Sequence, residues 1–336
     1  MSTSQHQKPQ QQETGVPHPE SNATAPRARR RPRRDERAPP RMRDWFLGWS
    51  WWLKDLVLPA YISETAPILV GGCGRSGTTL LQVILDAHPD LCCVNESSIM
   101  HLGKLDTSKL ANRIDLPIER VRKIADSSPR HSQFVERICN EFAENLGKTR
   151  WADKSPRNVR RLPYIFKHFP KARFVHMLRD GRDAACSLRT HPKYKRINGE
   201  LVELKTWKSI EDCAQRWQND VSEGLAWRGH PGYHELRYED LVSKPEQVLP
   251  ELFEFIGAPW TPEVLEYHRV EERSQKDPGF QKPLFLSSVS RWRKNMSPAD
   301  GATFQRIAGP LLKSLGYATD DNWTSELKEG NGKPPR

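Results

Sequence analysis

A glycine-rich turn, GGCGRSGTTLL at residues 71–81, limits most strongly the folds open to this chain. The short apolar run PILVGG at 67–72 leads into it and predicts a buried strand. Apolar residues at helical spacing follow from Gly77 and stop at Pro89, which predicts a helix. Such a strand–turn–helix unit aims backbone N–H groups and the helix dipole at one point, which suits a phosphate. A tight turn with a purely structural role is the alternative.

The spacing between Gly72 and Gly77 matches the front of a Walker A loop. The next residue is Thr78, where a Walker A loop requires lysine. Because the contact to the γ-phosphate of a nucleoside triphosphate is then missing, a P-loop kinase is disfavoured. The positive charge lies inside the turn instead, at Arg75.

A second strand–turn–helix unit is predicted in the middle of the chain. Residues 172–178 are apolar enough for a buried strand, the turn RDGR follows at 179–182, and a helix that carries Ser187 begins there. Two arginines and a hydroxyl at the carboxyl end of a strand form a second candidate anion site. An ordinary charged turn with internal ion pairs is the alternative.

The rest of the chain continues the alternation of strands and helices. We predict an amphipathic helix at 210–228, a strand that runs into a loop at 233–241, and a helix at 244–259. This order favours a parallel sheet covered by helices on both faces. We therefore expect a single α/β domain at 66–320, followed by a flexible C-terminal tail at 321–336.

The segment before this domain differs in composition. Residues 1–44 are rich in Gln, Pro, Ser and Arg and hold almost no large apolar residues, so we expect a disordered tail. Residues 45–65 carry four tryptophans. They predict either an interfacial helix, so that 27–62 contacts a membrane surface, or a helix that packs its tryptophans on the domain. No apolar run predicts a conventional membrane-spanning helix, and no secretory signal is recognisable.

The net charge of +11 indicates an anionic partner. About half of it lies in residues 1–44, where nine arginines and Lys8 oppose five acidic residues. A non-catalytic basic protein that binds nucleic acid or lipid is therefore the alternative to an enzyme. The six cysteines form no C-x-x-C pair, so no zinc ribbon is predicted.

Taken together, the two motifs resemble the 3′-phosphoadenosine-5′-phosphosulfate (PAPS)-dependent sulfotransferases, and within them most closely the tyrosylprotein sulfotransferases. The resemblance covers about residues 66–318. It rests on the order of five motifs: LCCVNES at 91–97, WADKSP at 151–156, RDGR followed by Ser187, RYEDLV at 237–242, and ERSQKDPGFQKP at 272–283. It implies a P-loop-like parallel sheet and transfer of a sulfuryl group from PAPS to an acceptor hydroxyl of a peptide, glycan or small molecule.

The resemblance also assigns roles to individual residues. A modified P-loop would hold the 5′-phosphosulfate and an Arg…Ser element the 3′-phosphate. The implied donor-binding residues are Arg75, Ser76, Gly77, Thr78, Thr79, Arg179, Ser187, Tyr238, Ser274 and Lys282. Glu96 falls at the place of the general base and Lys154 at that of a lysine acting on the leaving bridge oxygen, with Arg75 as a second cation. No metal is required, and the basic residues are then aimed at a small donor, which disfavours nucleic acid.

These residue types suit sulfuryl transfer. In-line attack needs the nucleophile, the sulfur and the bridging oxygen aligned, much as in phosphoryl transfer. A carboxylate such as Glu96 can remove the acceptor proton, and a cation such as Lys154 or Arg75 stabilises the charge that grows on the leaving oxygen. The alternatives are a surface carboxylate for Glu96 and an ion pair with Asp153 for Lys154.

The sequence departs from the tyrosylprotein enzymes at two places. Those lumenal enzymes form a disulfide between a cysteine near the base and a cysteine just before an Asp/Lys motif, which is DK at 153–154 here. In this sequence Cys93 stands at the first cysteine position, but Ala152 stands at the second. The missing bridge fits a reducing cytoplasm. Together with the contact expected for residues 27–62, it predicts a cytoplasmic protein at the periphery of a membrane surface.

The second departure concerns the arginines that bind acidic residues beside the target tyrosine. In that family the arginines stand two residues and about one helical turn after the base. Here Ser98 stands at the first of these positions, and no arginine follows until Arg113. Three arginines after the Asp/Lys motif either supply the missing charge or form a solvated helix face: Arg157, Arg160 and Arg161.

Overall fold

The computed structural model describes residues 42–101, 105–191, 193–197, 200–204, 206–269, 283–284 and 286–329. Contacts divide the chain into residues 1–37, which lie outside these ranges, and a compact unit of residues 38–336. The elements, in chain order, are α1 (Met42–Val57), β1 (Ile68–Gly72), α2 (Thr78–Ala87), β2 (Leu91–Asn95), α3 (Thr107–Ile114), α4 (Ile118–Ser127), α5 (His131–Asn145), β3 (Arg150–Lys154), η2 (Pro156–Arg161), α6 (Leu162–His168), β4 (Arg173–Leu178), α7 (Gly181–Arg189), β5 (Lys193–Ile197), β6 (Glu200–Leu204), α8 (Ile210–Leu225), β7 (Tyr233–Arg237), α9 (Tyr238–Ser243), α10 (Pro245–Ile256), η3 (Pro262–Arg269), α12 (Trp292–Asn295), α13 (Pro298–Ser314) and η5 (Asn322–Glu326).

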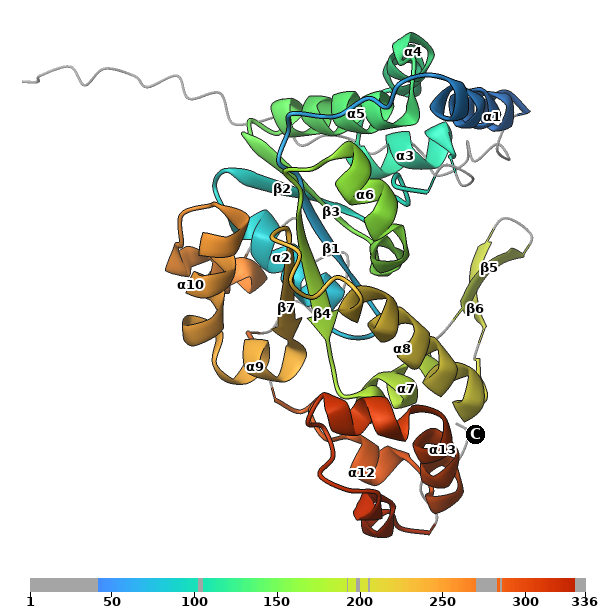
Figure 1. Cartoon of the computed structure of the whole chain (residues 1–336), viewed down its shortest axis with the longest axis vertical. Helices are drawn as coiled ribbons and strands as arrows, with labels where there is room; N and C mark the ends of the chain where they lie inside the picture. The colour runs from blue at the N-terminus through green and yellow to red at the C-terminus, as the bar shows by residue number, and fades with distance from the viewer. Residues whose placement is uncertain are drawn as a thin grey trace, which may run out of the picture. The chain divides into compact units, whose positions relative to one another are not determined.

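Five parallel strands form the central sheet, in the order β2-β3-β1-β4-β7 (Figure 1). Alternate residues of β1 belong to two different hydrophobic clusters, one on each face of the sheet. Leu69 packs with α5 and α6, whereas Ile68 and Val70 pack with α2 and α10. The sheet is therefore buried on both faces, as its continuous apolar strands require. The predicted parallel sheet covered by helices is confirmed. A separate hairpin pairs β5 with β6.

The parallel register brings the carboxyl ends of three central strands to one edge. Gly72 ends β1, Lys154 ends β3 and Leu178 ends β4, and the chain turns into a helix within a few residues of each. In open α/β sheets this edge is where ligands bind.

Several predicted boundaries differ from the structure. Residues 42–44, expected in a disordered tail, begin α1, and residues 1–41 of that predicted tail lie outside the described residues. Residues 238–241, expected in a loop, begin α9. The chain also stays packed beyond residue 320, because Trp323 of η5 is buried against Trp292, with 5.3 Å between the ring centres. The prediction of a flexible tail from residue 321 is therefore wrong for the described residues up to 329, where Trp323 and Leu327 are buried.

The prediction that the tryptophans of residues 45–65 pack on the domain is confirmed for Trp51 alone. Its ring is buried and stacks on Phe134 of α5, whereas the other three tryptophans of the helix are exposed. None of the helices in the described ranges is long and apolar enough to cross a membrane.

Gly72 offers a test of how closely β1 and β4 approach. Its φ is 136°, and a Cβ there would lie 2.5 Å from the carbonyl oxygen of Met177 on β4. Because a central strand cannot shift cheaply, Gly72→Ala is expected to lower the free energy of unfolding by about 2–4 kcal/mol, measured by urea denaturation.

Gly147→Ala is the matched control. Gly147 also has a positive φ, 65°, but a Cβ there meets nothing within 4 Å. Only backbone strain of about 1 kcal/mol is expected there. Equal losses in the two variants would contradict the close approach of the strands.

Candidate functional site

The loop after β1 is shaped by close contact with Tyr238. Gly77 has a φ of 87°, and a Cβ at this position would lie 2.5 Å from the Tyr238 ring. Gly77 also caps α2 without a side-chain hydrogen bond. The first turn of α2 therefore presents its N–H groups beside the ring, in the geometry predicted for an anion site.

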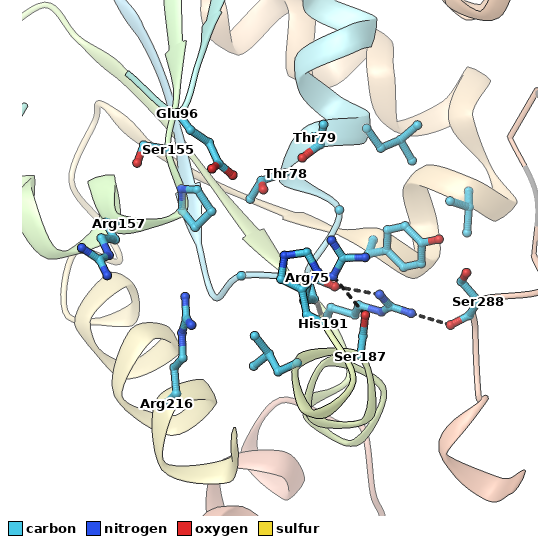
Figure 2. A pocket seen from close by; sticks show the side chains of 18 of the residues that line it. Arg75, Thr78, Thr79, Glu96, Ser155, Arg157, Ser187, His191, Arg216 and Ser288 are labelled. Carbon is cyan, nitrogen blue, oxygen red and sulfur yellow. Dashed lines mark hydrogen bonds between the residues drawn. The ribbon is translucent and has the colours of Figure 1, made fainter. Parts of the chain in front are cut away.

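A cavity of about 560 Å³ opens at this loop (Figure 2). Its basic lining residues are Arg75, Arg113, Arg157, Arg179, Lys208, Arg216 and Arg291. Of the described residues that line it, Glu96 alone is acidic. The pKa of His191, also in the lining, is lowered by burial and then by the charges of Arg75 and Lys208. The cavity is thus strongly positive and suits a ligand with several negative charges.

Lys154 is buried beside one end of the cavity, in contact with the lining residues Thr79 and Glu96. Its ammonium nitrogen donates to Thr79 Oγ1 at 3.1 Å and to Glu96 Oε1 at 3.2 Å. The lysine side chain is 1% exposed and that of Glu96 53% exposed. A cation, a hydroxyl of α2 and a solvent-facing carboxylate therefore meet, and the predicted catalytic pair, Glu96 and Lys154, is in contact.

Asp153 does not pair with Lys154, because successive residues of a strand point to opposite faces. Its buried carboxylate accepts from Ser97 Oγ at 2.5 Å and from Asn158 Nδ2 at 2.8 Å. Burial raises the pKa of Asp153 and lowers that of Lys154. The alternative interpretation of Lys154, an ion pair with its neighbour, is not what the structure has.

The backbone fixes Glu96 directly after β2. Its N–H donates to the Lys154 carbonyl at 2.6 Å, and its φ of 48° turns the chain out of the sheet. The bond from Ser97 to Asp153 holds the next residue against β3. Two adjacent strands therefore determine where the carboxylate stands.

Arg75 and Ser187 lie together at the other end of the cavity (Figure 2), and Arg179, which bonds to Arg75, also lines it. Arg75 Nε donates to Ser187 Oγ at 3.0 Å, and Arg179 Nη1 donates to the Arg75 carbonyl at 2.7 Å. The Arg179 guanidinium also lies 4.4 Å from the centre of the Tyr238 ring. Four predicted donor residues are thus brought together. Arg75 points away from Glu96 (Figure 2), so its catalytic role stays a prediction.

The RDGR turn has both of its alternative roles. Arg182 forms a buried ion pair with Asp180 at 2.7 Å, while Arg179 faces the cavity. Asp183 accepts backbone bonds from Ser290 at 2.7 Å and Trp292 at 2.8 Å. These bonds hold the nearby Ser288, whose carbonyl accepts from Arg179. The turn therefore joins the cavity to the C-terminal part of the fold.

Four buried polar atoms in this region have no hydrogen-bond partner among the described residues, and two of them belong to predicted donor-binding residues. Within the described residues, neither Ser76 Oγ nor Arg179 Nε has a hydrogen-bond partner. Both belong to the predicted donor-binding set, and leaving such atoms unpaired is costly. Ser274 and Lys282, the last predicted members, lie outside the described residues.

Several lining residues were not assigned from the sequence. Arg113 stands at the end of α3, and its guanidinium donates to the Asn95 carbonyl, beside Glu96. Of the three arginines after the Asp/Lys motif, Arg157 lines the cavity. Arg160 instead pairs with Asp220, and Arg161 donates to the Met100 carbonyl. The positive charge of these arginines is visible in the sequence, but the direction of each side chain depends on how α3 and η2 pack.

The cysteines agree with the missing disulfide. Cys93 of β2 lies directly opposite Ala152 of β3 in the strand register. All six cysteines are buried and free. In the described part of the chain, no group of three or more His, Cys, Asp or Glu side chains is arranged to hold a metal ion.

Comparison with known proteins gives consistent matches. The model of the sulfotransferase family matches residues 67–262. A protein-tyrosine sulfotransferase of Drosophila melanogaster is 26% identical over 276 residues, which cover 77% of this chain and 53% of that protein. Protein-tyrosine sulfotransferase 1 of Danio rerio is 25% identical over 284 residues, covering 79% and 76%. The chain thus spans about half the length of the Drosophila relative.

Solved structures share the fold. The sulfotransferase domain from the Synechococcus PCC 7002 olefin synthase has a TM-score of 0.53 and 21% identity, covering 76% of this chain and 96% of that one. The sulfotransferase domain from the curacin biosynthetic pathway has the same TM-score and identity, covering 76% and 98%. The predicted fold class is confirmed by these likenesses.

The contact between Lys154 and Glu96 predicts a measurable change in titration. Burial lowers the pKa of Lys154, and the Glu96 carboxylate partly opposes that effect. Glu96→Gln removes the negative charge, so the pKa of Lys154 is expected to fall further. The measurement is the ¹⁵N chemical shift of Lys154 Nζ as a function of pH, assigned with Lys154→Arg.

Glu119→Gln, a change at an exposed site in the first turn of α4, is the control. It should leave the pKa of Lys154 where it is. An unchanged pKa in Glu96→Gln would show that the two groups do not interact in solution.

Proposed function

The chain belongs to the sulfotransferase family, and from that premise we propose that it moves a sulfuryl group from PAPS to an acceptor hydroxyl that lies against Glu96. The observation that carries the proposal is the contact of buried Lys154 with both Glu96 and Thr79. It joins a candidate base, a candidate acid and the phosphate loop at one point. The matched region, 67–262, contains all three.

The donor would be held at both ends of the positive cavity. The loop from Arg75 to Thr79 would bind the 5′-phosphosulfate, and Arg179 with Ser187 the 3′-phosphate. The unpaired Ser76 Oγ and Arg179 Nε are suited to this, since phosphate and sulfonate oxygens are acceptors. Tyr238 would contact the nucleotide. PAPS supplies the sulfuryl group and leaves as 3′,5′-bisphosphoadenosine (PAP).

Glu96 and Lys154 would serve the two ends of the displacement. The half-exposed Glu96 carboxylate can take the proton of the acceptor hydroxyl while the hydroxyl oxygen forms its bond to sulfur. The bond from sulfur to the bridging phosphate oxygen breaks, and Lys154 stabilises or protonates that oxygen. Burial lowers the pKa of Lys154, so its ammonium gives up a proton more readily than an ordinary lysine.

We further propose a tyrosine in an acidic sequence as the acceptor. The relatives named protein-tyrosine sulfotransferases support the tyrosine. Arg113 and Arg157 support the acidic neighbours, because both line the cavity at the end that holds Glu96. Arg113 comes from a part of the chain other than the one where the family pattern has its arginines.

A reducing cytoplasm is the location we propose. It is supported by the pairing of Cys93 with Ala152 and by six free cysteines.

Paired variants separate donor binding from catalysis. Arg179→Ala removes charged hydrogen bonds and is expected to weaken PAP binding roughly 10- to 100-fold. Glu96→Gln keeps the side-chain shape, so PAP affinity should stay unchanged while kcat falls about 10²- to 10⁴-fold. Calorimetry with PAP and turnover with labelled PAPS and a tyrosine peptide give the two readouts.

Arg120→Ala, which breaks a surface pair with Glu141, should alter neither quantity. A preference for ATP over PAP would contradict the donor and favour a kinase. Full kcat in Glu96→Gln would remove Glu96 as the base.

The acceptor proposal has a test of its own. Arg157→Ala is expected to raise KM about tenfold for a tyrosine peptide with flanking Asp and Glu, and to leave KM for its Asn and Gln counterpart unchanged. Arg161→Ala, a neighbour that donates to the Met100 carbonyl, is the control. Turnover of small alcohols but of neither peptide would refute the peptide acceptor and leave the donor assignment intact.

A further inference from the structure

Helix α1 turns its charged residues toward the protein. Asp44 is buried and accepts from both the backbone N–H and the hydroxyl of Thr107, each at 2.9 Å. Asp55 pairs with Arg130 at 3.2 Å, and Arg43 pairs with Asp126. Trp51 is also buried, and its Nε1 donates to the Ser128 carbonyl at 2.9 Å. These contacts fix which side of the helix faces α3, α4 and α5 (Figure 1).

The outward side of α1 is apolar. Its exposed large apolar residues, which we call the aromatic face, are Met42, Trp45, Phe46, Trp49, Trp52, Leu53, Leu56 and Val57. They recur every three or four residues and so form one stripe. Lys54 is the one exposed charged residue of this helix. A surface helix normally packs its apolar side on the protein and presents charged residues to water. In α1 the two sides are exchanged.

The charge of the preceding sequence identifies what fits this face. Nine arginines lie between residues 27 and 43, immediately before the aromatic face and partly overlapping it. Tryptophan favours the headgroup region of a bilayer, and arginines near the surface are attracted to anionic lipid. A second copy of this chain would instead bring the same cationic segment to an apolar contact, with like charges opposed.

We propose that α1 docks the protein on an anionic lipid surface, with the aromatic face lying in the headgroup region. The helix has 16 residues, and its other side is fixed to the protein through Asp44 and Trp51. It therefore lies along the surface. The docking is independent of sulfuryl transfer, because none of its residues lines the cavity.

Sedimentation of the full chain with vesicles tests the proposal. We expect binding to vesicles of phosphatidylcholine and phosphatidylserine at 70:30 that weakens at high salt. The triple variant Trp45→Ser, Trp49→Ser, Trp52→Ser should lose roughly tenfold or more in partition coefficient. Leu146→Ser, at an exposed leucine on another helix end, should bind as the wild type does. Brominated lipid chains should quench tryptophan fluorescence in the wild type and much less in the triple variant.

A second variant separates the role of charge. Replacing the arginines from 27 to 37 with Gln should remove most of the salt dependence and leave weaker binding through the aromatic face. Unchanged melting temperature and PAP affinity in every variant establish that the fold is intact.

Two outcomes would overturn the proposal. One is equal vesicle binding by wild type and triple variant, or no binding by either. The other is a dimer in light scattering that the triple variant turns into a monomer, without vesicle binding, which would assign the face to a second copy.

Discussion

The ammonium group of Lys154 is the interaction on which the rest of the site depends. A buried charge must be paired and hydrogen-bonded, and Lys154 meets that need with Glu96 and Thr79. Its partners come from the turn after β2 and the first turn of α2, while Lys154 itself ends β3. The three elements meet only because β2, β3 and β1 run parallel in one register. Sheet order is therefore a condition for the chemistry.

The same edge gathers positive charge without collapsing on itself. Arg179 lies over Tyr238 and bonds to two carbonyl groups, and Arg75 bonds to Ser187, so these neutral partners help to hold both guanidinium groups. Two nearby carboxylates are engaged elsewhere, Asp180 by Arg182 and Asp183 by backbone N–H groups, whereas Asp220 pairs with Arg216 of the lining at 3.5 Å. The fold thereby keeps a cavity whose charge remains available to an anionic ligand.

Local patterns predicted the parts of this architecture that are apolar and continuous. β1, β4 and the helices that follow them could be placed from residues 67–88 and 172–189, because buried strands and glycine turns are distinctive in sequence. β2 and β3 were not predicted as strands, because WADK is a polar run for a strand, and the resemblance marks only motifs at 91–97 and 151–156. The direction of Arg113 and Arg157 could not be predicted, because it follows from how α3 and η2 pack. The hold of Trp323 on the C-terminal segment likewise depends on a distant partner, Trp292.

The orientation of α1 shows why composition alone leaves two alternatives open. Both sides of the helix carry tryptophan, so hydrophobic periodicity does not choose which side is buried. The choice follows from Asp44 and Asp55, because each has a polar partner on the protein, Thr107 and Arg130 respectively. Turning the helix over would bury the aromatic face and expose these carboxylates, but it would leave Thr107 and Arg130 without their acceptors. Polar satisfaction therefore overrides apolar burial here, and a face suited to lipid remains in contact with solvent.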